Sequence, residues 1–312
     1  MDDNMMLNWL KFFPFSIEKD SKNKPAEIHG PYFSKLRKNK WTFGDTNLLF
    51  DAPWANPIFS LDGSGSTVDA IKPGRVNILK NDWERVYNNS NAPRDFLDKS
   101  LFYENSWYFS GPWFSGMKEF ITGRAILASV SKGSRFEKLN LLDPRVFEMA
   151  LGDFLDHAYG YDRSGKRAHY RGPLNWSILP MSPTVHGVIC DIHQIHNGSR
   201  DNPVVTRLVF FPVTTSQFIR VSFSFGGLDI HDEVRAKPVF ALCDSIIDSM
   251  RLEVGPSTQA EWDKVKETCP DMTLSDTMGE FKWPLFEEET NSEPTEKEIL
   301  QKHPANRISD KP

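Results

Sequence analysis

The chain has few cysteines, and their spacing argues against a paired-thiol site. Only three occur in 312 residues, Cys190, Cys243 and Cys269. They are odd in number and widely spaced, and no C-x-x-C pair exists. Cys190 falls in an apolar strand pattern and Cys243 on an apolar helical stripe. We therefore expect buried thiols in a reducing compartment.

Motifs for nucleophilic or metal-dependent hydrolysis are also missing. The chain contains neither G-x-S-x-G nor H-E-x-x-H. The Gly/Ser-rich segment Asp62–Thr67 lacks the lysine that follows a phosphate-binding loop, so we interpret it as a connection. We predict that the protein is not an enzyme and needs no cofactor. An enzyme whose site forms only in space stays open as the alternative.

An excess of positive charge and a long apolar run are absent as well. The formal net charge is −5 at pH 7, which disfavours a nucleic-acid partner. The apolar patch Leu7–Phe15 is interrupted by Asn8, Lys11 and Pro14, so it is too broken to span a membrane. The first residues are acidic where a signal peptide is basic. We expect a cytoplasmic protein without a membrane span; an anchor preceding this chain stays open.

The stretch Val204–Leu252 organises the predicted fold. Residues 204–213 are apolar on both faces, which is typical of a central strand, and residues 218–225 alternate with period two, which is typical of a half-buried strand. Thr214–Gln217 is short enough for a hairpin turn. We predict that Pro238 opens a helix whose apolar stripe packs on this sheet. The stripe consists of Val239, Leu242, Cys243, Ile246, Ile247 and Met250.

Further elements follow from spacing and from turn residues. Asp143 and Pro144 begin a predicted helix, and Ser257 is the predicted cap of another that ends at Cys269. We predict strands at residues 107–114, 120–130 and 185–195, short helices at 81–87 and 93–102, and irregular structure at 173–183. The fold class is α+β, with antiparallel sheet and amphipathic helices packed on one face.

The expected domain organisation has five parts. Residues 1–35 are a loosely attached segment, 36–142 a first α+β half, and 143–255 a second half of similar kind. Residues 256–286 hold a helix and an extended segment. Residues 287–312 are charged and poor in apolar side chains, so we expect a disordered tail.

Aromatic residues are unusually frequent, at 12% of the chain. Several tryptophans lie in polar, turn-rich segments: Trp54, Trp83, Trp107, Trp113, Trp176 and Trp283. Core packing is one interpretation of these aromatic residues, and a surface cluster used for a partner is the alternative. The strongest local candidate for partner binding is the basic, tyrosine-bearing loop near residue 165, where arginine and tyrosine could meet an acidic protein surface; a solvated loop is the other interpretation. The candidate partner-binding residues are Tyr161, Arg163, Lys166, Arg167, Tyr170, Arg171 and Trp176.

Histidines and carboxylates gather around residues 186–196 and 229–231. On a strand, Asp191 and His193 share a face, as two ligands of one metal must. His231 could supply a third ligand from across the sheet. This pattern supports the alternative function, a metal-dependent hydrolase with a site around His186–His196 and Asp229–His231; a polar strand end explains the same residues without a metal.

Two stretches resemble known families. The hairpin followed by Ala241–Leu252 resembles the end of DcrB-like and PsbP-like domains, in which a terminal helix packs on an antiparallel sheet. Residues 145–159, 170–176 and 210–212 resemble bacterial proteins found with type VI secretion toxins. The resemblance covers about half of the chain. It implies an immunity protein or an effector adaptor, which acts through its surface.

Three functional hypotheses follow. The first is a cytoplasmic protein-binding module of a bacterial secretion system, an immunity protein or effector adaptor that neutralises a toxin by masking it. The second is the metal-dependent hydrolase. The third is a component of a secretion or envelope machine tethered through Leu7–Phe15. The partner's identity and the oligomeric state stay open.

Overall fold

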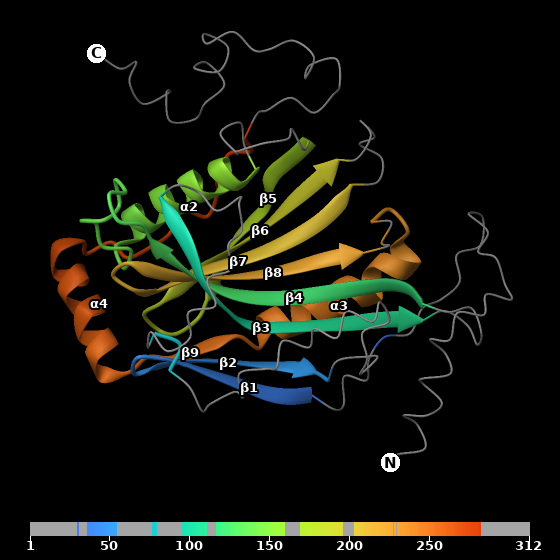
Figure 1. The fold of residues 1–312 in the computed structure, drawn as a ribbon, viewed down its shortest axis with the longest axis horizontal. Helices are drawn as coiled ribbons and strands as arrows, with labels where there is room; N and C mark the ends of the chain where they lie inside the picture. Colours follow the sequence, from blue (N-terminus) through green and yellow to red (C-terminus); the bar gives the residue numbers. More distant parts are fainter. Residues whose placement is uncertain are drawn as a thin grey trace, which may run out of the picture.

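The computed structural model describes residues 30, 36–54, 77–79, 95–110, 117–159, 169–195, 203–226, 228 and 230–281. Two antiparallel sheets and three helices form the described part, which confirms the α+β class (Figure 1). The predicted connection Asp62–Thr67, the predicted short helix at 81–87 and the expected tail 287–312 lie outside the described residues, as does the segment 1–35 apart from Gly30.

The larger sheet has six strands in the order β3-β4-β8-β7-β6-β5. Their bounds are β3 (Phe96–Ser110), β4 (Met117–Val130), β5 (His169–Pro180), β6 (His186–Ile195), β7 (Val204–Thr214) and β8 (Gln217–Gly226). The predicted hairpin within Val204–Leu252 is confirmed, since β7 and β8 meet at a two-residue turn, Thr215–Ser216. β7 is central, as its apolar character on both faces indicates.

The smaller sheet has the order β1-β2-β9, with β1 (Leu36–Phe43), β2 (Thr46–Pro53) and β9 (Arg251–Glu253). β1 and β2 form a hairpin around Gly44, whose φ of 63° lies in the left-handed region that favours glycine. β9 joins the other edge of β2, so strands about 200 residues apart in sequence complete this sheet.

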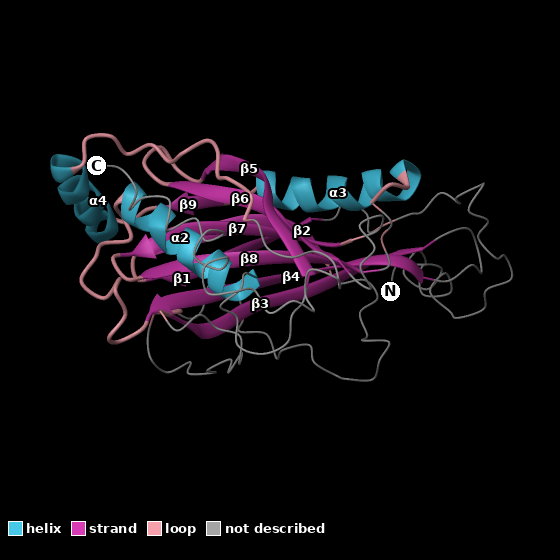
Figure 2. Cartoon of the chain, turned by 90° about the horizontal axis from the view of Figure 1, so that it is seen from above, coloured by secondary structure: helices cyan, strands magenta, loops and turns pink. Residues whose placement is uncertain are grey.

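The helices lie on both faces of the large sheet, where the sequence predicts one face. They are α2 (Pro144–Tyr159), α3 (Glu233–Asp248) and α4 (Pro256–Thr268). α2 packs with Phe210 and Phe218 in one buried cluster, while α3 packs with Phe211 and Ile219 in another. Neighbouring positions of β7 and β8 carry large apolar side chains on opposite faces, so both faces need a cover. α4 lies at one end of the molecule in both views (Figures 1 and 2).

Aromatic packing is densest under α2. Phe218 is fully buried, and its ring meets those of Phe96, Phe147, Phe154 and Phe210 at centroid distances of 5.6 to 6.3 Å. Most of these contacts are edge-on, the geometry that the ring quadrupole favours. Core packing thus accounts for the phenylalanines of this region.

Two helix starts differ from the prediction. Pro238 lies inside α3, because Asp232 caps the helix earlier and its carboxylate accepts from the N–H groups of Val234 and Arg235. Ser257 does not cap α4. Its N–H and hydroxyl both donate to the carboxylate of Asp45 in the β1–β2 turn, at 2.7 and 2.6 Å.

Two segments predicted as helix or irregular structure are strands. Residues 96–102 begin β3, and 173–180 belong to β5. Both strands contain bulges that shift the register, which breaks the alternation that identifies a strand in sequence. β5 also lies at a sheet edge, where Pro173 and Pro180 are tolerated.

The expected boundary between residues 142 and 143 stays a prediction. Strands from both sides of it pair with one another: β4 with β8 in the large sheet, and β2 with β9 in the small one. None of the described helices combines the length and apolar character that crossing a membrane requires.

Candidate functional site

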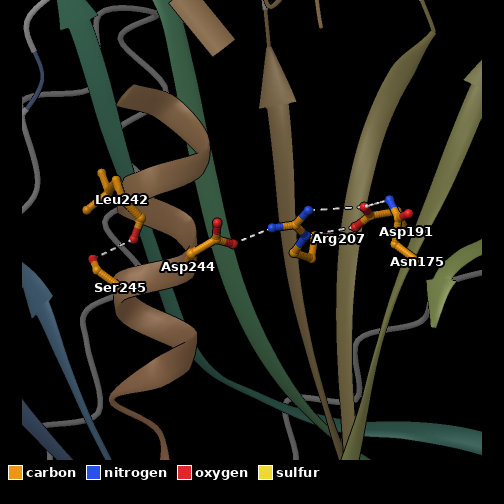
Figure 3. Close-up of polar contacts among 6 residues, drawn as sticks. All are labelled: Asn175, Asp191, Arg207, Leu242, Asp244 and Ser245. Atoms are coloured by element: carbon orange, nitrogen blue, oxygen red, sulfur yellow. Dashed lines mark hydrogen bonds and ion pairs between the residues drawn. The ribbon is translucent and has the colours of Figure 1, made fainter. Parts of the chain in front are cut away.

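The histidine–carboxylate region of β6 is built around an ion-pair network. Arg207 on β7 donates to both carboxylate oxygens of Asp191 on β6, from Nε at 2.8 Å and from Nη2 at 3.1 Å. Asn175 on β5 donates to Oδ2 of Asp191 at 2.8 Å. The remaining arm of Arg207 binds Asp244 of α3, so one guanidinium connects sheet and helix (Figure 3).

The Asp191–Arg207 part of this network lies inside the protein, and Asp244 lies at the surface. Side-chain exposure is 3% for Asp191 and 17% for Arg207, whereas Asp244 is 52% exposed. Burial opposes the charge of Arg207, but the hydrogen bond and charge of Asp191 outweigh it and raise the pKa of Arg207. The guanidinium also lies over the ring of Phe240, with Cζ 5.2 Å from the centroid. The arrangement holds α3 against the sheet.

The predicted metal ligands do not form a metal site among the described residues. Both oxygens of Asp191 already accept from Arg207. His231 acts electrostatically on His193. Among the described residues, however, no group of three or more histidine, cysteine, aspartate or glutamate side chains is able to hold a metal ion. Burial lowers the pKa of His193, although Asp191 opposes the shift. Asp229 and His196 lie outside the described residues.

A small hollow lies between α2, β6 and α4. His186, Thr184 and Trp262 line it together with apolar side chains, and its volume of about 10 Å³ is room for about one water molecule. Nδ1 of His186 and Nε1 of Trp262 are buried and meet no acceptor among the described residues. The hollow is too small for a substrate.

All three cysteines are free and buried, as the sequence predicts. Burial raises the pKa of the thiols of Cys190 and Cys243. A thiol held in this protonated state is a poor nucleophile. These side chains therefore serve packing.

The predicted partner-binding loop is only partly described. Tyr161, Arg163, Lys166 and Arg167 lie outside the described residues. The three described members contact other parts of the same chain. Tyr170 packs edge-on against Tyr159 at 5.1 Å, Arg171 binds Glu280 through two hydrogen bonds, and Trp176 donates to the carbonyl of Ser275.

A different surface presents an exposed aromatic side chain. Trp54 directly follows β2 and is 62% exposed. Cζ of Arg37 lies 4.8 Å from its ring centroid, and Leu36, 44% exposed, is in register with Pro53. We call Leu36, Arg37 and Trp54 the hairpin corner. Tryptophan and arginine are the residue types most enriched at protein–protein contacts.

The hairpin corner is held from below by β3. The carbonyl of Pro53 accepts from Nε1 of Trp107, which is fully buried, at 3.1 Å, and from Asn105 at 3.4 Å. The backbone just before Trp54 is thereby fixed. An exposed aromatic ring on a fixed backbone loses little conformational entropy when it binds.

Sequence reasoning singles out Trp54 only as one of several aromatics near turns and does not identify Leu36 or Arg37. The run of basic residues in 35–40 reads as solvated, and no apolar alternation marks it as a strand. The signal that could have found the corner is the position of Trp54 immediately after a strand that ends in proline.

Comparisons with known proteins give little. No protein-family model matches the chain, and no curated protein matches it. Among solved structures, the apo immunity protein TplEi of the type VI secretion system of Pseudomonas aeruginosa is similar at 13% identity, over 76% of this chain and 79% of that one, with a TM-score of 0.21. A TM-score this low carries no argument about fold or function.

Proposed function

We propose that this chain is a protein-binding module, and that it works as an immunity protein or effector adaptor of a bacterial secretion system, masking a toxin in the cytoplasm. The observation that carries the binding function is the hairpin corner. Trp54 is 62% exposed, the guanidinium of Arg37 lies over its ring, and its preceding backbone is held through Pro53; tryptophan and arginine on a rigid backbone are typical of the residues that dominate binding energy at protein interfaces.

The described histidine–carboxylate region gives no support to the alternative of a metal-dependent hydrolase. Its buried carboxylate, Asp191, is saturated by Arg207 and Asn175, and the network positions α3. The immunity or adaptor role is supported by the sequence resemblance at residues 145–159, 170–176, 210–212 and 241–252.

Co-expression with a secreted toxin tests the proposal. The probe is the product of the gene adjacent to this one in its source genome. We expect a stable complex with restored growth of the toxin-expressing host. The variant Trp54→Ala should weaken the complex by about 2 kcal/mol or more, which is roughly a 30-fold rise in Kd by titration calorimetry.

Leu139→Ala is the control, because Leu139 is another exposed apolar residue (39%) and lies outside the corner. Equal affinities for the Trp54→Ala variant and the unaltered chain would remove the hairpin corner from the interface. Failure of the toxin to bind, with its host still poisoned, would contradict the immunity role.

A further inference from the structure

The β1 strand has a defined outer edge. In a two-residue hairpin the pair that flanks the turn, here Phe43 and Thr46, exchanges backbone hydrogen bonds, and every second pair along the ladder does the same. The N–H and C=O groups of Asn39 and Trp41 therefore face β2. Those of the intervening residues face away from it.

Independent contacts agree with this assignment. The carbonyl of Thr42 accepts from the N–H of Ile78 at 2.8 Å, on the side away from β2. The backbone N–H and C=O groups of Lys40, Lys38 and Leu36 point to the same side as those of Thr42, because the backbone groups of residues two apart along a strand have the same orientation. Within the described residues, β1 pairs only with β2, apart from a single parallel bridge between Thr42 and Asn77. The edge thus already accepts one backbone hydrogen bond at the end next to the turn.

The positive charge of β1 favours an acidic strand as the partner of this edge. β1 contains Arg37, Lys38 and Lys40 and no acidic residue; Lys40 reaches Glu253 at 3.6 Å, and Lys38 is in register with Asp51 of β2. A second copy of β1 would place lysine opposite lysine, which destabilises a strand pair. An acidic strand would place opposite charges there.

The outer edge of β1 is continuous with the hairpin corner. Leu36, 44% exposed, is the first residue of β1, and Trp54 directly follows its register partner Pro53, with Cζ of Arg37 over its ring. A strand added here gains backbone hydrogen bonds along β1 and an apolar contact at its end. Backbone pairing supplies affinity in such complexes, and side-chain pockets supply specificity.

We propose that an acidic, extended segment of a partner protein adds to β1 as a new strand along Leu36–Lys40, with an apolar side chain against Trp54. The inference rests on the protein-binding function proposed above and specifies its mode. In this mode, the positive charge of β1 determines which segments bind, and hydrogen bonds to the backbone of Lys38 and Lys40 supply the affinity.

Peptide display on the full chain tests this mode. A random library of 12-residue peptides is selected on the unaltered chain and counter-selected on Lys38→Pro, which removes one outward N–H but leaves the β1–β2 ladder intact. We expect the selected peptides to be enriched in aspartate and glutamate alternating with apolar residues. They should bind Lys38→Pro at least tenfold more weakly.

Two further variants keep the test decisive. Lys38→Glu retains the N–H and reverses the charge, so it should weaken the same peptides, and more at low salt than at high salt. Asn39→Pro removes an inward N–H and should lower the melting temperature, whereas Lys38→Pro should not. Hydrogen exchange of the Lys38 and Lys40 amides should be fast in the free chain and slow once peptide is bound.

Several outcomes would overturn the inference. They are selected peptides that are neutral or basic, undiminished binding to Lys38→Pro, and amides of Lys38 and Lys40 already protected in the free chain. A toxin complex that is lost in Trp54→Ala but retained in Lys38→Pro would refute strand addition while leaving the binding function in place.

Discussion

Removing Arg207 should be among the most damaging single changes in the sheet. The variant Arg207→Ala leaves the carboxylate of Asp191, whose side chain is 3% exposed, with only the amide of Asn175 as a described donor. Breaking a buried ion pair on one side costs about 3–5 kcal/mol, since the remaining charge stays buried. Arg207 is itself 17% exposed, so we expect the lower end, about 3 kcal/mol.

Urea unfolding followed by circular dichroism measures this cost without screening the charges. A loss of about 3 kcal/mol corresponds to a fall in melting temperature of roughly 6–12 °C for a chain of this size. The double variant Asp191→Ala with Arg207→Ala should cost less than the sum of the two single variants by about 2 kcal/mol, because the second change removes the stranded charge.

A surface pair provides the matched control. Arg124 binds Glu104 at 2.7 Å but is 46% exposed, so Arg124→Ala should cost at most about 1 kcal/mol. Additive costs at Asp191 and Arg207, or a loss at Arg207 no greater than that at Arg124, would refute the view that this network holds α3 on the sheet.

Three other predictions concern the core and the pH dependence of stability. Phe218→Ala should cost about 3–5 kcal/mol in the same assay, because the ring is fully buried among other aromatic rings; a cost under 1 kcal/mol would contradict the packing described. Partial burial opposes ionisation of Asp45, yet hydrogen bonds from Ser257 and Thr258 outweigh it and lower its pKa to about 2. A depressed carboxyl pKa stabilises the fold above about pH 4, and this effect is lost as pH falls through about 2, so Asp45→Asn should cost about 1 kcal/mol after solvent screening at pH 7 and less than about half of that at pH 2; a cost that does not change with pH would contradict this. Burial lowers the pKa of His193, so its neutral form favours the fold above about pH 6.5 and this contribution is lost as pH falls; His193→Gln should flatten the melting temperature between pH 7.5 and 5.5, and an unchanged slope would contradict it.

The regular elements could be predicted from local pattern. β7, β8 and the stripe of α3 follow the periods of strand and helix, and every predicted stripe residue is buried. The predicted start of α3 at Pro238 was wrong because the sequence offers two start signals. Proline suits the first turn of a helix, but the helix begins earlier, where Asp232 is the N-cap. The first part of β3 and all of β5 were missed because bulges remove the alternation on which the prediction depends.

The candidate site depended on distances that no sequence pattern carries. The alternation of β6 correctly places Asp191 and His193 on one face, but it does not show that Arg207 of the next strand occupies the carboxylate. The hairpin corner combines Leu36 and Trp54, which are 18 positions apart in sequence and come to the same end of the hairpin through the β1–β2 register. Such a pair becomes visible once strand pairing is known.

The pairing of β4 with β8 has a consequence for synthesis on the ribosome. Ten residues of β4, Phe120–Ser129, bond to residues 217–226, which are translated about a hundred residues later. Until that later strand leaves the exit tunnel, the edge of β4 that pairs with β8 lacks its partner strand. An unpaired strand edge favours aggregation. Premature termination near residue 142 would therefore release a fragment in need of a chaperone, and the nascent chain would complete its sheet late.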